Sequence, residues 1–545
     1  MGGARFARRL RSLTFLLDLI IFAANSRIPV KENNRLPEIQ EIITPKEERF
    51  LRWRNTIGLF LGPLIGLALF LLPMSGLSRK AHVLAAIMGW VITWWITEPI
   101  PIPATALFGS VLCVLFGVAG AKEAFASFAD PTIFLFLGSF ILARAMSVHG
   151  LDKRFAYRIM SLRWVGNSSG RLLVAYGAIS AFISMWISNT ATTAMMFPIG
   201  LGIVSTMAEL ISRQTGKPTD VHKLRFGTGM MLMAAYAASA GGIGTPVGTP
   251  PNLIGLAMIE KYTKIRIPFF QWMVFAVPLL IVMFVLLSVL MVLLHKPEVR
   301  RLEGGREYVK EGLRQLGKWT PGQVNSLIAF LLAVCLWVAP GFLALRYGTS
   351  SPLAKTYQAR LPEAAAAVLA ASLLFILPID WKKREFTLSW KQAVKIDWGT
   401  LILFGGGITL GDLMFKTQLA EAVGRGLLNL VGAHSLWGIT LAAIFLSIVV
   451  SEATSNTASA TMVVPVILSL SIAAGVNPLP PAIGATLGAS WGFMLPVSTP
   501  PNAVVFGSGM VPITKMIRAG FLFDILGGLA IWLGLRLLLP LAGLV

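Results

Sequence analysis

The segment Ser188–Gly200 reads SNTATTAMMFPIG and lies inside a long apolar stretch of the chain. Consecutive Ser, Asn and Thr residues cost free energy in hydrocarbon unless other groups satisfy their hydrogen bonds. A near copy, SNTASATMVVPVI, spans Ser455–Ile467, and six of the first twelve aligned positions are identical. The repetition of a costly polar triplet indicates a functional requirement that is met twice.

The composition around these triplets is that of a polytopic, all-α membrane protein. Of the 545 residues, 55% are hydrophobic and only 13% are charged. Since a membrane-spanning helix needs about 20 apolar residues, the sequence predicts about eleven spans outside the two SNT regions, 172–211 and 435–474. The predicted spans lie near 56–73, 81–97, 105–120, 131–148, 226–259, 270–294, 323–342, 363–380, 399–413, 481–508 and 519–541.

Residues 1–55 form a basic leader that precedes the first predicted span. Its stretch RFARRLRSLTFLLDLIIFAAN has a basic start and a short apolar run, as a secretory signal does. Asp18 interrupts the run and a charged segment follows it. The alternatives are a cleaved signal and an amphipathic helix on the membrane surface, and the pattern favours the surface helix.

The net charge of +22 is distributed in a way that predicts topology. With the N-terminus in the cytoplasm, the predicted cytoplasmic segments carry 34 Lys and Arg, and the external segments carry 11. This excess follows the positive-inside rule, so membrane lipids, and not nucleic acid, are the expected partners of the basic charge. The C-terminus is then external, in a cell or plasma membrane. Each SNT region must return to the side from which it enters, region 172–211 from the cytoplasm and region 435–474 from outside.

A second polar break follows each SNT triplet. The sequences are GGIGTPVGTPPNLIG (Gly241–Gly255) and GFMLPVSTPPNAVVFG (Gly492–Gly507), which share the core Thr-Pro-Pro-Asn. Paired prolines break a helix, and a broken helix at membrane depth is tolerated where it is buried or lines a cavity. A hairpin followed by a broken helix, occurring twice in opposite orientations, predicts an inverted-topology repeat and a secondary transporter. The predicted repeats are 56–294 and 321–545, joined by a cytoplasmic linker, 295–320.

The chemistry of the triplets suits ions of both signs. Ser, Asn and Thr are helix N-caps, so helices beginning at Ala191 and Ala458 would direct free amides toward a carboxylate or similar anion. The helix that arrives at each tip ends in carbonyls that suit Na⁺. No Lys or Arg lies within the SNT or TPPN stretches, so the anion site is expected to lack them. Arg144 and Asp412 are interpreted as interfacial charges. Glu452 is either a proton relay or, as the more favoured alternative, a structural hydrogen-bonding group.

At these residues the sequence resembles the divalent anion/sodium symporter family, the INDY-like transporters of di- and tricarboxylates. Two further stretches match the family, ITEPIPIPATAL (Ile96–Leu107) and HGLDKR (His149–Arg154), and the resemblance covers all of the chain beyond the leader. It implies a scaffold domain and a transport domain, with eleven spanning helices plus two re-entrant hairpins. It also implies a homodimer that works by an elevator movement.

The resemblance further implies the substrate and sodium ligands, with Na⁺ as the coupling ion and no organic cofactor. Ser498 stands where the first repeat has Gly248, so the second cation site departs from the first. The implied substrate-binding residues are Asn189, Thr190, Thr249, Ser455, Asn456, Thr457, Thr499 and Pro500. The implied first sodium site uses Ser188, Asn189 and the carbonyls of Ser184 and Gly248, and the second uses Asn456 and the carbonyls of Ser451, Thr454 and Ser498.

The predicted function is sodium-coupled symport of C4-dicarboxylates or related anions, and the protein is not expected to be an enzyme. Sodium-independent dicarboxylate exchange and sulfate transport are the alternatives within the same class. A membrane hydrolase is disfavoured, because GASWG (Gly488–Gly492) would need a strand–turn–helix context and a partner histidine. GLRQLGKW (Gly312–Trp319) lacks the Ser or Thr of a phosphate-binding loop. An anion channel is the third class, since pores can also be built from inverted repeats.

Overall fold

The computed structural model describes residues 45–74, 76–162, 165, 168–302, 304–348, 351–431 and 435–544. The predicted leader therefore lies largely outside the described residues. The elements of the first half are α2 (Pro45–Leu71), α3 (Arg79–Thr97), α4 (Ile102–Leu115), α5 (Ala121–Ala126), η1 (Ser127–Ala129), α6 (Pro131–Val148), α7 (Leu151–Met160), α8 (Ser169–Ser184), α9 (Asn189–Thr215), η2 (Val221–Lys223), α10 (Arg225–Gly242), α11 (Pro250–Thr263), α12 (Phe269–Leu294) and α13 (Gly305–Gln315).

The second half continues this helical pattern with one short hairpin of strands, β1 paired antiparallel to β2. Its elements are α14 (Pro321–Tyr347), α15 (Pro352–Arg360), α16 (Glu363–Leu373), β1 (Pro378–Asp380), β2 (Glu385–Phe386), α17 (Trp390–Ala393), α18 (Trp398–Lys416), α19 (Leu419–Val431), α20 (Leu436–Ala453), α21 (Asn456–Ala473), α22 (Leu479–Gly488), α23 (Pro500–Phe506) and α24 (Ile513–Leu541). The prediction of an all-α protein is confirmed.

Among the described residues, nine helices are long and apolar enough to cross a membrane. They include α9, α20 and α21, which are arms of the two predicted hairpins. Several predicted spans match single helices closely, as 131–148 matches α6 and 270–294 matches α12. The predicted span 226–259 is divided into α10 and α11, and 481–508 is divided into α22 and α23, as the proline pairs require.

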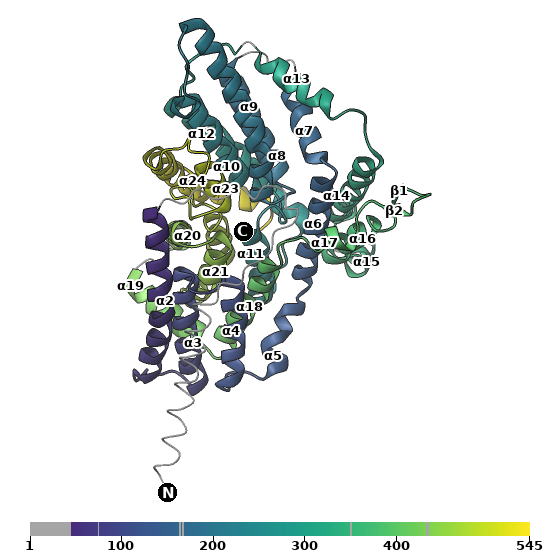
Figure 1. The fold of residues 1–545 in the computed structure, drawn as a ribbon. Helices are drawn as coiled ribbons and strands as arrows, with labels where there is room; N and C mark the ends of the chain where they lie inside the picture. The colour runs from purple at the N-terminus through teal and green to yellow at the C-terminus, as the bar shows by residue number, and fades with distance from the viewer. Residues whose placement is uncertain are drawn as a thin grey trace. The chain divides into compact units, whose positions relative to one another are not determined.

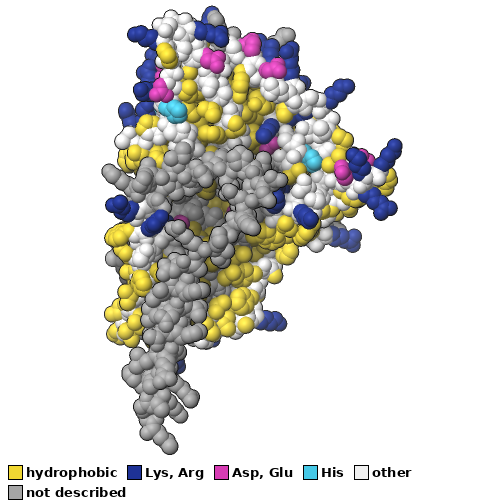
Figure 2. All heavy atoms as spheres, viewed as in Figure 1, with side chains coloured by type: hydrophobic (Ala, Val, Ile, Leu, Met, Phe, Trp, Pro, Cys, Tyr) yellow, Lys and Arg dark blue, Asp and Glu magenta, His cyan; other side chains and the backbone are white. Residues whose placement is uncertain are grey.

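Apolar stripes on the outer faces of the long helices identify the surface that meets lipid. On α24, exposed Phe521, Ile525, Leu529, Leu533 and Leu537 recur every four residues, which places them on one face of the helix. The helix α12 carries a similar stripe. Figure 2 shows hydrophobic side chains over much of the coloured part of the visible face, with many of the Lys and Arg side chains along its upper edge and at the β1–β2 hairpin. A protein with such a surface belongs in a bilayer, and the chain is a multi-pass membrane protein.

Two groups of helices can be distinguished in the compact unit that contains residues 45–544, and α18 of the second group also packs on α21 of the first. Helices α8 to α12 lie against α20 to α24, and Figure 1 shows these teal and yellow-green segments side by side. In the second group, α2 packs on α3, α3 and α18 pack on α4, and α16 lies between α6 and α14. The SNT triplets and TPPN breaks all belong to the first group.

Small residues allow the helices of the first group to approach closely, and they do so in the same way in both halves. A Cβ at Gly241 of α10 would stand 2.2 Å from the carbonyl oxygen of Ala181 in α8. A Cβ at Gly488 of α22 would stand 2.7 Å from the carbonyl oxygen of Ile444 in α20. Glycine at such crossings is the usual means of close packing between membrane helices. Each hairpin is thereby held against the first segment of its broken helix.

The HGLDKR stretch connects α6 to α7 and anchors the linker between the halves. Arg154 is buried and donates to the carbonyls of Leu316 at 2.8 Å, Gly317 at 3.0 Å and Lys318 at 3.1 Å. Its guanidinium also lies 5.1 Å from the Trp319 ring centroid. Burial raises the pKa of the neighbouring Asp152 carboxyl. These contacts give the matched stretch a structural role at the end of the linker.

Candidate substrate and sodium site

Each SNT triplet lies at the turn of a helical hairpin. Between α8 and α9, Ser188 is the N-cap of α9 and accepts a hydrogen bond from the Ala191 amide at 3.3 Å. Between α20 and α21, Ser455 caps α21 and accepts from the Ala458 amide at 3.2 Å. The predicted starts at Ala191 and Ala458 are two residues late, because the serine alone serves as the cap and Asn and Thr are already helical.

The two asparagines of the triplets make matching hydrogen bonds back to their hairpins. Ser184 Oγ donates to Asn189 Oδ1 at 2.7 Å, and Ser451 Oγ donates to Asn456 Oδ1 at 2.8 Å. Both serines lie in the last turn of the arriving helix, five residues before the asparagine. The bond ties the amide oxygen of each tip to the helix end whose carbonyls are free, and so gathers several oxygen atoms in one place.

The TPPN breaks are also built alike in both halves. Asn252 Nδ2 donates to the carbonyls of Gly242 at 2.9 Å and Thr245 at 2.8 Å. Asn502 Nδ2 donates to the carbonyls of Gly492 at 3.3 Å and Leu495 at 3.0 Å, at the same sequence offsets. The buried Asn amides thus satisfy carbonyls that the break removes from helical pairing. The asparagine of the motif holds the shape of the break.

A cluster of oxygen atoms surrounds the first tip at Gly248. A Cβ at this residue would stand 2.4 Å from the Gly242 carbonyl oxygen and 3.0 Å from that of Met185. A Cβ at Gly242 would stand 2.6 Å from Asn189 Oδ1. Only glycine permits this approach of two backbone segments and an amide oxygen. The donor set consists of uncharged oxygens, which is the kind of ligand that hard cations prefer.

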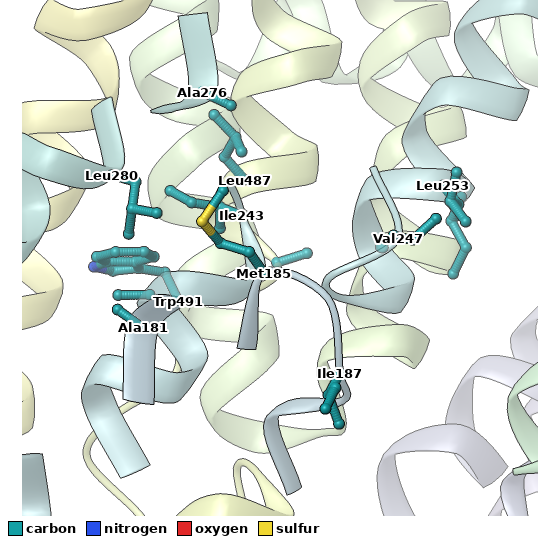
Figure 3. Close-up of a cluster of buried hydrophobic side chains, with 14 of the residues drawn as sticks. Ala181, Met185, Ile187, Ile243, Val247, Leu253, Ala276, Leu280, Leu487 and Trp491 are labelled. Carbon is teal, nitrogen blue, oxygen red and sulfur yellow. The ribbon is translucent and has the colours of Figure 1, made fainter. Parts of the chain in front are cut away.

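Apolar side chains fix the first tip from behind. Figure 3 shows Met185 and Ile187 of the tip, Ile243 and Val247 of the break, Leu280 of α12 and Trp491 of the second break in one cluster. All six side chains are buried. The Thr245 hydroxyl also donates to the Met185 carbonyl. The cluster therefore contains parts of both halves and gives the oxygen-rich tip a rigid support.

The second tip departs from the first at Ser498, and the structure gives a reason. Its hydroxyl donates to Glu452 Oε2 at 2.6 Å, and Glu452 Oε1 accepts from the Met494 amide at 2.8 Å. The first hairpin has Met185 where the second has Glu452, and Gly248 where the second has Ser498. A polar pair in one repeat thus replaces an apolar residue and a glycine in the other. Glu452 makes the structural hydrogen bonds that the favoured alternative predicts.

Removing only one member of this pair is expected to destabilise the protein. Ser498→Gly should lower the free energy of unfolding by about 1–3 kcal/mol, because it removes the hydroxyl that donates to Oε2 of a buried carboxyl group. In the double variant Glu452→Met with Ser498→Gly, which reproduces the first repeat, the loss should be smaller than the sum of the two single losses. Thermal unfolding of the four proteins in detergent measures this coupling, and strictly additive shifts in Tm would contradict the pairing.

One cavity of about 670 Å³ brings the predicted substrate residues together. Its wall includes all eight of them and also Ser188 and Gly248. Both tips and both breaks therefore face the same space, although the sequence places the halves far apart. The remaining predicted sodium ligands lie behind this wall, where Ser184, Ser451, Thr454 and Ser498 are buried.

The anion site at the motifs is still expected to lack Lys and Arg, but the cavity as a whole contains both. Arg144 of α6 and Lys395, which follows α17, both line it, together with Asp397. Arg144 is therefore more than an interfacial charge. Asp412, the other residue interpreted in that way, pairs with Lys261 at 2.7 Å and links α18 to α11. The SNT and TPPN motifs do not predict the basic residues of the cavity, because these residues lie outside both motifs.

The structural contexts that the two enzyme-like motifs require are not found at either of them. Ser490 of GASWG follows helix α22, whereas a nucleophile elbow follows a strand. Its side chain is fully buried. Gly312 of GLRQLGKW lies within helix α13, whereas a phosphate-binding loop follows a strand. Neither segment has the geometry of its motif.

The comparisons with known proteins agree with this architecture. The model of the sodium:sulfate symporter transmembrane region matches residues 54–540. The sodium-dependent dicarboxylate transporter SdcS of Staphylococcus saprophyticus is 37% identical over 498 residues, which are 91% of this chain and 93% of that protein. SdcS of Staphylococcus aureus strain USA300 is 35% identical over 489 residues, which are 89% and 91% of the two chains.

Among solved structures, the YdaH transporter of Alcanivorax borkumensis matches with a TM-score of 0.49 and 14% identity, over 90% of this chain and 97% of that one. The family assignment rests on the sequence matches, which extend over nine-tenths of the chain and include both SNT and both TPPN motifs. The chain belongs to the sodium:sulfate symporter family, the divalent anion/sodium symporters that its motifs predict.

Proposed function

We propose that the protein is a secondary active symporter that couples the inward movement of Na⁺ to the uptake of C4-dicarboxylates. The observation that carries the proposal is the single cavity lined by the SNT and TPPN motifs of both halves. The relatives named as sodium-dependent dicarboxylate transporters support both the ion and the substrate class. The name of the family adds sulfate as a candidate anion.

The substrate would bind between the two tips. The amides that begin α9 and α21 carry partial positive charge, and the side chains of Asn189, Thr190, Asn456 and Thr457 add donors for the carboxylates. Thr249, Thr499, Pro500 and Ser455 complete the proposed contacts. A site of neutral donors holds a dianion without the full strength of a fixed cation, which favours its release on the other side of the membrane.

Sodium would bind behind each tip and hold it in shape for the substrate. At the first tip the ligands are Ser188, Asn189 and the carbonyls of Ser184 and Gly248. At the second they are Asn456 and the carbonyls of Ser451, Thr454 and Ser498. Since Asn189 and Asn456 lie both in the cavity wall and in these clusters, an ion at either tip orders a residue that the substrate needs. This shared residue is a direct means of coupling.

Transport would follow from relative movement of the two helix groups. The group of α8–α12 and α20–α24 would be the transport domain, and the group of α2–α6, α14, α16 and α18 would be the scaffold of an elevator in a homodimer. The repeats 56–294 and 321–545 would have opposite orientations in the plasma membrane, with the N-terminus cytoplasmic and the C-terminus external. The segments near Arg144 and Lys395 carry the basic charge assigned to the cytoplasm, so the cavity would open inward.

Uptake of labelled succinate into proteoliposomes tests the proposal. We expect accumulation that needs an inward Na⁺ gradient, is lost when K⁺ replaces Na⁺, and does not need succinate inside. Uptake that needs internal succinate and ignores Na⁺ would instead establish an exchanger. Sodium-driven uptake of labelled sulfate, without uptake of succinate, would keep the coupling ion and change the substrate. A flux far above the turnover of any carrier would indicate a channel.

A further inference from the structure

The cavity has two chemically different walls. One wall is formed by the tips and breaks, which carry no Lys or Arg. The other contains one face of α6, to which Phe140, Ala143, Arg144 and Ser147 contribute at helical spacing. The segment between α17 and α18 adds Lys395 and Asp397 to this second wall. The charged groups of the cavity therefore lie on a different group of helices from the proposed anion site.

Arg144 and Lys395 line the same cavity, and the Arg144 side chain and the Lys395 backbone meet at one carbonyl without an acidic partner. The Gln392 carbonyl accepts the Arg144 Nε–H at 3.3 Å and the Lys395 backbone N–H at 3.2 Å. Neither side chain forms an ion pair with any residue that the structure describes. Two cations that line one cavity without an acidic partner make it a favourable place for an anion.

Asp397 does not neutralise this pair. Its carboxylate accepts from the Thr400 amide at 3.1 Å and from the Thr400 hydroxyl at 2.5 Å, where it caps helix α18. These bonds direct it to a helix N-terminus, whose partial positive charge it balances. The wall opposite the tips thus keeps an excess of one positive charge over the three charged residues that line the cavity.

We propose that Arg144 and Lys395 form a cationic station for polycarboxylate anions, placed in the cavity opposite the neutral binding site at the tips. The inference rests on the proposed function and adds to it a determinant of affinity and charge selectivity. The station raises the concentration of multivalent anions in the cavity through long-range attraction, while the tips supply the directional contacts. The station belongs to the other helix group. A substrate that moves with the tips therefore moves away from Arg144 and Lys395 and is no longer attracted by them.

Binding of labelled succinate and labelled citrate to the detergent-solubilised full chain tests the station. Na⁺ is held fixed and ionic strength is varied with choline chloride. At low ionic strength we expect Arg144→Gln and Lys395→Gln each to raise the Kd for succinate by about threefold to tenfold, and the Kd for citrate by more, because the attraction grows with ligand charge. High salt should remove most of the difference.

Two further variants separate charge from structure. Lys391→Gln removes an exposed lysine of α17 that does not line the cavity, so its Kd should equal that of the wild type. Arg144→Lys keeps the charge and should stay near wild type, whereas equal weakening in Arg144→Lys and Arg144→Gln would mean that Arg144 acts only by binding the Gln392 carbonyl. If Arg144→Gln fails to fold, Lys395→Gln decides, since the Lys395 side chain makes no hydrogen bond or ion pair within the described residues.

The possible outcomes separate a failure of the proposed transport function from a failure of the cationic station. A wild-type protein that binds no dicarboxylate in the presence of Na⁺ would overturn the proposed function. Wild-type binding with no difference between Lys391→Gln and the two cavity variants would overturn the station alone. An effect that is equal for succinate and citrate, or independent of salt, would also overturn it.

Discussion

Replacement of Asn189 or Asn456 by alanine is expected to reduce sodium-driven succinate uptake by at least about 100-fold, since loss even of an outer partner of a bound metal ion costs 10- to 100-fold. Each asparagine lies in the cavity wall and has an oxygen bonded to a serine of its own hairpin, Ser184 or Ser451. Its removal takes away a proposed ligand of the ion and of the carboxylate at once. Initial rates in proteoliposomes, normalised to reconstituted protein, measure the loss.

Asn325→Ala is the matched control for these two variants. Asn325 Nδ2 donates to the Pro378 carbonyl at 3.0 Å and to Thr387 Oγ1 at 2.8 Å, away from the cavity. Its loss should lower Tm and leave uptake per folded protein close to wild type. Uptake by Asn189→Ala within a few-fold of the control would show that the tips do not perform the role assigned to them.

Gly248→Ala is expected to raise the Na⁺ concentration needed for half-maximal uptake by about tenfold or more, by analogy with lost metal-site partners. The added methyl group would stand 2.4 Å from the Gly242 carbonyl oxygen, so a backbone segment must shift. Such overpacking also costs about 1–3 kcal/mol of stability. The variant should therefore bind sodium poorly at the first tip even where it remains folded.

Gly170→Ala controls for the glycine substitution within the same hairpin. A Cβ at Gly170, in the first turn of α8, meets no atom within 4 Å. Its sodium dependence should be that of the wild type. Titration of Na⁺ in the uptake assay compares the two variants, and an unchanged half-maximal concentration in Gly248→Ala would exclude the proposed first cation site.

Both tips and both breaks could be predicted from the sequence because their structure is local. A serine before Asn-Thr caps the helix that follows it, and a Pro-Pro pair ends the helix that precedes it, whatever lies around them. The duplication of SNT and TPPN then identified the segments that meet. The helices begin at Asn189 and Asn456, two residues before the predicted starts. The pattern does not say which of the three residues Ser, Asn and Thr acts as the N-cap.

The rest of the site depends on contacts that no local pattern encodes. Arg144 meets the Gln392 carbonyl across 248 residues of sequence, and Ser498 meets Glu452 across 46. Such pairs follow from helix packing, in which a rotation or shift of one element changes every partner. The opposite orientation of the repeats remains a prediction from the distribution of Lys and Arg.

The sodium dependence of labelled succinate binding to the purified wild-type protein tests whether the two proposed cation sites are coupled to the anion site. Two ion sites that order one substrate site predict binding that is absent without Na⁺ and rises more steeply than first order with its concentration. Asn189→Ala and Asn456→Ala should each abolish succinate binding over the same range of Na⁺ concentrations. Succinate binding of equal affinity in Na⁺ and in K⁺ would contradict the coupling of paired cation sites to one anion site.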